Sequence, residues 1–91
     1  MKYFDWSGDK NEQLKKIRGI SFEEVLVVIE QGQVLDIVEP KNRIKYPGQK
    51  IFIIYLHGYV YVVPFVEDKE KIFLKTIFPS RQATKKYISD N

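Results

Sequence analysis

The chain has 91 residues, of which 44% are hydrophobic and 14% aromatic, and this composition suits one small domain over residues 1–91 with its own core. It contains no cysteine, which excludes disulfides and thiolate metal sites. No apolar run has the length of a signal peptide or of a membrane span of about 18 residues, so we expect a soluble cytoplasmic protein.

Charge is distributed unevenly along the chain. The formal net charge is +3, but residues 1–40 carry five Lys or Arg against eight Asp or Glu, whereas residues 41–91 carry ten against four. The second half is therefore a candidate surface for a polyanion. The alternative is a solvated, lysine-rich sheet edge, which would discourage edge-to-edge pairing.

The first third of the chain predicts two helices. A short aromatic element at residues 4–6 comes first, and then Ser7 or Asp9 can cap a helix that runs to about Arg18. A second helix begins at the capping box formed by Ser21 and a glutamate three residues later. Helical spacing places four apolar side chains of this second helix in the core: Phe22, Val25, Leu26 and Ile29.

From Val34 onward the hydrophobic period changes to two, which predicts an antiparallel sheet. His57 and Gly58 form a turn signal between two of the strands, and Pro64 indicates an edge position, a bulge or early termination. Ser80 caps a final helix that runs to about Ser89. The predicted class is α+β, with two N-terminal helices, a C-terminal helix and about four strands, at residues 34–39, 51–56, 59–66 and 71–78.

The sequence offers few residues for metal binding or nucleophilic catalysis. Its only histidine, His57, lies in the predicted turn, so we expect no metal site and no serine-type triad. No glycine-rich phosphate loop is present, and no cofactor is expected. Glu23 and Glu24 fall in the first turn of a helix, where negative charge favours the helix dipole, so we interpret them as capping residues.

A set of basic and aromatic residues remains, and RNA-binding proteins use cations for phosphates and rings for bases. On the predicted last strand, Lys75 shares a face only with apolar side chains, so it stands alone there or lies where that face meets a groove. On the final helix, Tyr87 either packs the helix onto the sheet or takes part in function. The set is Arg43, Lys45, Tyr46, Lys50, Tyr55, Tyr59, Tyr61, Lys75, Arg81, Lys85, Lys86 and Tyr87.

Two blocks of the sequence resemble the BrnT family of bacterial type II toxins, which have a RelE-like ribonuclease fold. The first block is Phe4-Asp5-Trp6, then Lys10, then the run GISFEE at residues 19–24. The second is the run SRQAT at residues 80–84 with Tyr87 downstream. The chain departs from the family pattern, which often has an Asn, a Lys-His pair, an arginine and a histidine, at Leu14, Ile17-Arg18, Thr76 and around Pro64.

The resemblance implies a toxin of a type II toxin–antitoxin pair, which cleaves mRNA without a metal ion and is held inactive by a cognate antitoxin. Attack of the RNA 2′-OH on the adjacent phosphate requires cations for the charged transition state and groups that move protons. Ribosome dependence, a homodimer and a hetero-oligomer with the antitoxin all stay open. The alternatives are a non-catalytic RNA- or protein-binding module and a structural interaction module. The implied catalytic residues are Arg81, Lys75, Tyr87 and Lys45, and the implied RNA-binding residues are Lys10, Arg43, Lys50, Lys85 and Lys86.

Overall fold

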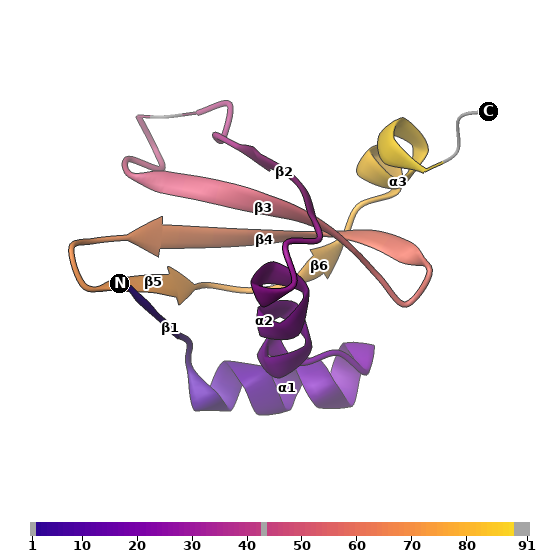
Figure 1. Cartoon of the computed structure of the whole chain (residues 1–91), viewed down its shortest axis with the longest axis horizontal. Helices are drawn as coiled ribbons and strands as arrows, with labels where there is room; N and C mark the ends of the chain where they lie inside the picture. Colours follow the sequence, from indigo (N-terminus) through magenta and orange to yellow (C-terminus); the bar gives the residue numbers. More distant parts are fainter. Residues whose placement is uncertain (1, 43, 89–91) are drawn as a thin grey trace.

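The computed structural model of the protein describes residues 2–42 and 44–88. Within these residues, six strands form one sheet with the order β1–β5–β4–β3–β2, and β6 pairs with β4 (Figure 1). The elements in chain order are β1 (Tyr3–Asp5), α1 (Gly8–Arg18), α2 (Phe22–Glu30), β2 (Val34–Val38), β3 (Gln49–Leu56), β4 (Tyr59–Glu67), β5 (Lys71–Leu74), β6 (Phe78–Pro79) and α3 (Arg81–Tyr87).

The predicted α+β class is confirmed, but the antiparallel sheet of about four strands is wrong. The aromatic element at the start of the chain is a strand, β1, which pairs in parallel with β5 and makes the sheet mixed. Phe4 lies opposite Ile72, and the Tyr3 amide donates to the Glu70 carbonyl at 3.1 Å. Three residues are too few to show a hydrophobic period, so the sequence did not reveal this strand.

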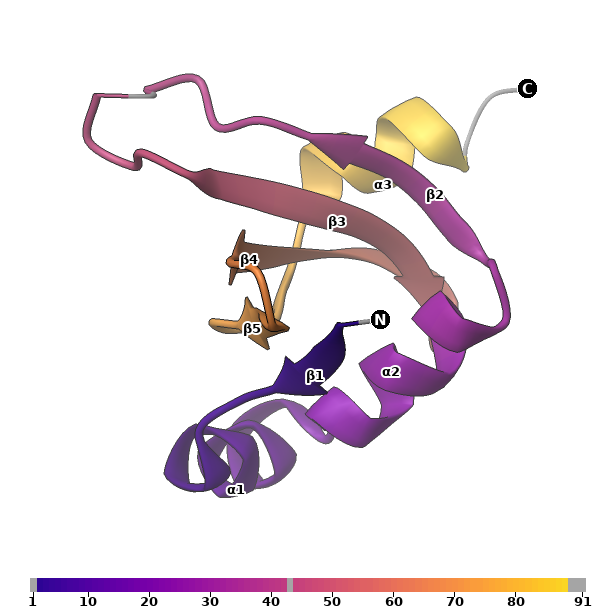
Figure 2. The ribbon, with the colours of Figure 1, turned by 60° about the vertical axis from the view of Figure 1, so that its left-hand side comes forward.

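The two faces of the sheet are covered differently. α1 and α2 pack on one face, which we call the inner face, and α3 lies on the opposite, outer face (Figure 2). α2 buries Phe22, Val25 and Val28, whereas the predicted core residues Leu26 and Ile29 are only half-buried. The core between the helices and the inner face consists of Leu14, Ile20, Phe22, Val25, Val28, Phe52, Ile54, Val63, Phe65, Leu74 and Ile77.

The helix ends follow local sequence signals closely. Ser7, rather than Asp9, caps α1, and its hydroxyl accepts from the Lys10 amide at 3.2 Å. Gly19 ends α1 in the left-handed region, with φ of 67°. The last helix, α3, ends at Tyr87, and the predicted end near residue 89 lies outside the described residues. None of the described helices is long and apolar enough to cross a membrane.

A buried asparagine joins α1 to α2. The Asn11 amide nitrogen donates to the Glu23 carboxylate at 2.8 Å, and its oxygen accepts from the Phe22 amide at 2.8 Å. The hydrogen bond from Asn11 is the main reason that the pKa of Glu23 lies below its ordinary value. Ser21 and Glu24 form the predicted capping box, so Glu23 and Glu24 both serve the start of α2.

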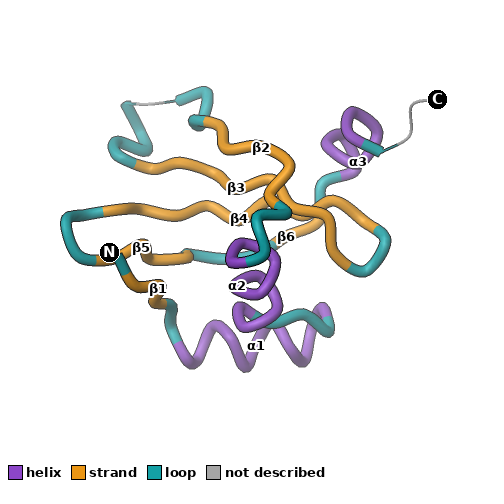
Figure 3. Tube along the Cα trace, viewed as in Figure 1, coloured by secondary structure: helices purple, strands orange, loops and turns teal. Residues whose placement is uncertain are grey.

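The turn between β3 and β4 is the predicted one. His57 and Gly58 have φ of 56° and 76°, as the right-handed twist of a two-residue hairpin requires. The His57 Nε2 atom lies 2.8 Å from the Glu24 carboxylate, so this exposed ring ties the hairpin to the start of α2. By contrast, the described residues between β2 and β3, 39–42 and 44–48, form no helix or strand (Figure 3).

The last predicted strand is interrupted by a bulge. β5 ends at Leu74 and β6 begins at Phe78, so a single continuous strand is wrong here. Residues 75–77 face only two residues of β4 in the pairing register, which inserts one extra residue. Pro64, one of those two, has no N–H to donate, but its carbonyl accepts from the Lys75 amide at 2.8 Å.

The bulge also changes which side chains share a face. Strict alternation assigns Leu74 and Ile77 to opposite faces, yet both are fully buried in the core. Ile77 therefore leaves the face that it was predicted to share with Lys75. The Lys75 side chain is exposed and lines a hollow, in agreement with the predicted alternative that it lies where its face meets a groove. The extra residue is the physical reason, because it reverses the side-chain alternation once.

Candidate nucleic-acid interface

The outer face of the sheet carries two hollows that lie side by side. The first has a volume of about 390 Å³, lies against α3, and includes Ile53 and Val62 of the sheet. The second has a volume of about 350 Å³, lies against the loop from β2 to β3, and includes Ile51 and Phe78. Val62 pairs directly with Phe78, so the hollows adjoin, and together we call them the outer groove.

The lining of the outer groove combines positive charge with accessible rings. Lys41 and Lys86 line the hollow at α3, and Lys75 lines the hollow at the loop. None of the residues that line either hollow is acidic. Tyr46 and Phe78 line the second hollow, and each side chain is 39% exposed. Next to this lining, the Asp36 carboxylate accepts a hydrogen bond from Tyr87 and interacts with the charge of Lys86. The three lysines and the exposed rings form a surface that suits a single-stranded nucleic acid.

α3 is held on the sheet by two hydroxyl side chains of the SRQAT block. The Ser80 hydroxyl caps the helix by accepting from the Ala83 amide at 3.0 Å, and the Ser80 amide donates to the Val60 carbonyl at 3.0 Å. The Thr84 hydroxyl accepts from the Val60 amide at 3.1 Å and donates to the Ser80 carbonyl at 2.8 Å. These bonds give Ser80 and Thr84 a structural role, because they fix one wall of the outer groove against β4.

Tyr87 closes the far end of α3 onto β2. Its phenol donates to the Asp36 carboxylate at 2.8 Å. This bond, together with burial and the charge of Asp36, raises the pKa of Tyr87. The bond from Tyr87, and a second one from the Ile37 amide at 2.8 Å, lower the pKa of Asp36. The phenol is therefore protonated at neutral pH and is a proton donor rather than a base.

Two of the four predicted catalytic residues line the outer groove, and the other two are neighbours in sequence of residues that line it. Lys75 and Tyr87 line it, in different hollows, and the Lys75 ammonium donates to the Gln49 side chain at 3.4 Å. Arg81 is exposed in the first turn of α3 and follows directly after the groove residue Ser80. The Lys45 ammonium lies 5.4 Å from the ring centre of Tyr46, a cation–π distance, in the loop that bounds the second hollow.

The predicted RNA-binding residues are more scattered. Lys86 lines the groove, with its ammonium 5.4 Å from the ring centre of Tyr87, whereas Lys85 is exposed on α3 and is not among the groove residues. Lys10 lines a separate pocket on α1. Arg43 lies outside the described residues.

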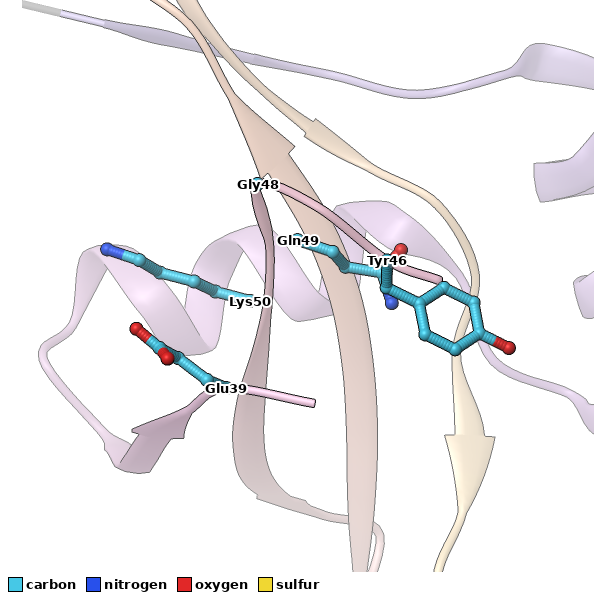
Figure 4. Close-up of a pocket in the computed structure, with 5 residues that line it drawn as sticks. All are labelled: Glu39, Tyr46, Gly48, Gln49 and Lys50. Carbon is cyan, nitrogen blue, oxygen red and sulfur yellow. The ribbon is translucent and has the colours of Figure 1, made fainter. Parts of the chain in front are cut away.

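Lys50 belongs to a different environment from the groove lysines. It lines a pocket of about 230 Å³ at the start of β3, together with Glu39, Tyr46, Gly48 and Gln49. Figure 4 shows the side chains of Glu39 and Lys50 extending to the same side, while the ring of Tyr46 points away from them. This pocket has a negative Glu39 carboxylate as well as the positive Lys50. We therefore expect it to bind a phosphate more weakly than the outer groove does.

Sequence reasoning missed Lys41 as a groove residue. It follows Pro40 in the loop after β2, and the only signal was its contribution to the basic charge of the second half of the chain. Reasoning also missed Arg18 and Gln13, which line the α1 pocket with Lys10 and Thr76. Lys10, Gln13 and Arg18 share one side of α1, but Thr76 is distant in the chain, so no local pattern joins it to them.

Other chemistry has little support in the described residues. No group of three or more His, Cys, Asp or Glu side chains lies together there in an arrangement that could hold a metal ion. The single histidine, His57, lies in the hairpin turn, and no residue of the outer groove is a histidine.

Comparison of the chain with protein-family models, with curated proteins and with solved structures found no match. What the site can do therefore follows from the chemistry of its own residues.

Proposed function

We propose that the protein is the toxin of a type II toxin–antitoxin pair and that it binds and cleaves mRNA in the outer groove. The observation that carries this proposal is the lining of the groove, with Lys41, Lys75 and Lys86, no acidic residue, and the exposed rings of Tyr46 and Phe78. RNA can place its phosphates on these lysines and stack its bases on these rings. The two sequence blocks that resemble BrnT toxins supply the expected reaction.

In this reaction the 2′-OH attacks the adjacent phosphate, the bond to the 5′-oxygen breaks, and the products are a 2′,3′-cyclic phosphate and a 5′-hydroxyl. Arg81 and Lys75 would stabilise the charge of the pentacoordinate phosphate. Tyr87, whose phenol stays protonated, would give its proton to the 5′-oxygen once it leaves Asp36. Lys45, in its free-amine form, would take the proton of the 2′-OH.

The cognate antitoxin would inhibit the protein by covering this surface. A segment that covers the outer groove would exclude RNA from both hollows at once, since they adjoin at the Val62–Phe78 pair. Carboxylates on that segment would pair with the groove lysines, because the residues that line the groove include three lysines and no acidic side chain.

The test compares wild type with Arg81→Ala and with Lys69→Ala, which removes an equal charge from the exposed turn before β5. Each purified protein is mixed with 5′-labelled single-stranded RNA in EDTA, and its fold is checked by circular dichroism. We expect wild type and Lys69→Ala to release fragments with cyclic phosphate ends. Arg81→Ala should be about 10²–10³-fold slower, as for loss of a group that stabilises transition-state charge.

Expression in cells gives a second readout. Wild type should arrest growth, and Arg81→Ala should not at an equal yield of folded protein. Wild type that leaves RNA intact and is harmless when expressed alone would overturn the nuclease proposal.

A second candidate is a protein that binds RNA in the same groove without cutting it. Two observations favour it: the Tyr87 phenol is already bound by Asp36, and the only histidine, His57, lies in the hairpin turn. In addition, Arg18 and Pro64 occupy positions where the resembled family often has histidine. Tight RNA binding by a folded wild type, with no cleavage and no growth arrest, would select this candidate.

A further inference from the structure

The α1 pocket lies on the other side of the bulge from the outer groove. It has a volume of about 220 Å³ and is lined by Lys10, Gln13, Leu14, Ile17, Arg18 and Thr76. Five of these residues come from one side of α1, at spacings of three and four residues. The sixth, Thr76, belongs to the connection between β5 and β6, which passes above α1 in Figure 1.

The charged residues that line this pocket favour binding of an anion. Two of its lining residues are basic and none is acidic. Within the described part of the chain, the side chains of Lys10 and Arg18 form no hydrogen bond or ion pair, whereas Lys15 on the same helix binds Glu12 at 3.2 Å. Lys10 and Arg18 are about 12 Å apart along the helix axis, at 1.5 Å per residue, a span that successive backbone phosphates can occupy.

The α1 pocket and the outer groove share one lining residue. Thr76 lines both the α1 pocket and the second hollow of the groove, and its neighbour Lys75 lines that hollow. β1 pairs with β5 only as far as Phe73, so residues 75–77 form the border of the sheet at this place. A strand of RNA leaving the groove past Lys75 can therefore pass around the border and reach α1.

We infer that single-stranded RNA bound in the outer groove continues around the bulge at Thr76 into the α1 pocket, where Lys10 and Arg18 bind its backbone phosphates. This inference rests on the proposed RNA binding and adds a second contact region, so that longer RNA binds more tightly than RNA that fills the groove alone. Gln13 and Thr76 add uncharged polar groups, and no aromatic residue lines this pocket. The contact is therefore to the phosphate backbone and independent of base sequence.

The experiment measures the affinity for two fluorescent 2′-O-methyl RNAs, which lack the attacking 2′-OH and cannot be cut. They have lengths of about 4 and about 16 nucleotides, the range that single-stranded sites span. The variants are Lys10→Ala with Arg18→Ala, the charge-keeping pair Lys10→Arg with Arg18→Lys, and Lys16→Ala. Lys16 is the matched control, since it is an exposed cation of α1 that does not line the pocket.

We expect the alanine pair to bind the long RNA at least tenfold more weakly at low salt and to bind the short RNA as wild type does. Its plot of log affinity against log salt for the long RNA should be less steep by about 1.4, which is about 0.7 for each lost phosphate contact on a single strand. The charge-keeping pair and Lys16→Ala should behave as wild type. A folded alanine pair that binds the long RNA normally would overturn this inference alone. Failure of wild type to bind either RNA would overturn the proposed function as well.

Discussion

Neighbouring residues of the same strands meet very different surroundings on the two faces of the sheet. On the inner face, Ile54 and Val63 are 0% exposed beneath the first two helices. On the outer face, Ile51 and Val62 are only half-buried, because α3 has seven residues and covers just part of the sheet. The inner face holds the fold together, while the outer face leaves apolar surface and lysines open to a ligand.

The difference shows how an incomplete layer can make a binding surface. β3 is apolar on both faces from Ile51 to Ile54, a pattern that predicts cover on both sides. The second layer is short, and its place is partly taken by the two hollows of the outer groove. Apolar surface that remains open beside basic residues is a common mark of an interaction site.

The largest expected effect is on stability and tests whether the inner face contributes more to it than the outer face does. Ile54→Ala should lower the free energy of unfolding by about 2–5 kcal/mol, because it leaves a cavity in a closed core. Ile51→Ala, on the same strand and the opposite face, should cost less than half as much, since its side chain already borders a hollow. Urea denaturation of both variants measures the difference. Equal losses would show that the outer face is packed as tightly as the inner one.

A smaller effect, on RNA affinity, is expected when an aromatic ring is removed from the outer face. Phe78→Ala should weaken binding of single-stranded RNA by about 5- to 100-fold, since stacking of one base contributes about 1–3 kcal/mol. Tyr3→Ala removes an exposed ring from β1, away from the groove residues, and should leave binding unchanged. Fluorescence anisotropy with the long uncleavable RNA gives both values. A stronger effect of Tyr3→Ala than of Phe78→Ala would place RNA on a different surface.

The smallest effect concerns the bond that closes α3 onto the outer face. Asp36 has a lowered pKa in the folded protein, so its contribution is present above its unfolded pKa of about 4 and is lost as pH falls through the folded value. Tyr87 has a raised pKa, so its contribution is complete below about pH 10 and is lost as pH rises through the folded value.

The difference in stability between wild type and Tyr87→Phe should therefore be constant from about pH 5 to pH 9 and should shrink toward both extremes. Urea denaturation at a series of pH values measures this difference. A gap that stays the same at every pH would mean that the Tyr87–Asp36 bond contributes nothing and that loss of the hydroxyl acts in another way.

The sequence by itself determined the features that depend on a few neighbouring residues. The capping box of Ser21 and Glu24, the glycine end of α1 and the His57-Gly58 turn were predictable, because backbone conformation and capping bonds are set within four residues. Of the site, Lys75, Lys86 and Tyr87 were chosen from the sequence and do line the groove.

The tertiary structure alone decided which of these residues meet. Parallel pairing of β1 with β5, the buried bonds of Asn11 and the gathering of Lys41 with Lys86 join residues that are distant in the chain. The bulge before β6 depends on Pro64 of another strand, and it moved Ile77 off the face that it was predicted to share with Lys75. Such contacts arise from long-range pairing and packing, so a hydrophobic period or a charge count cannot reveal them.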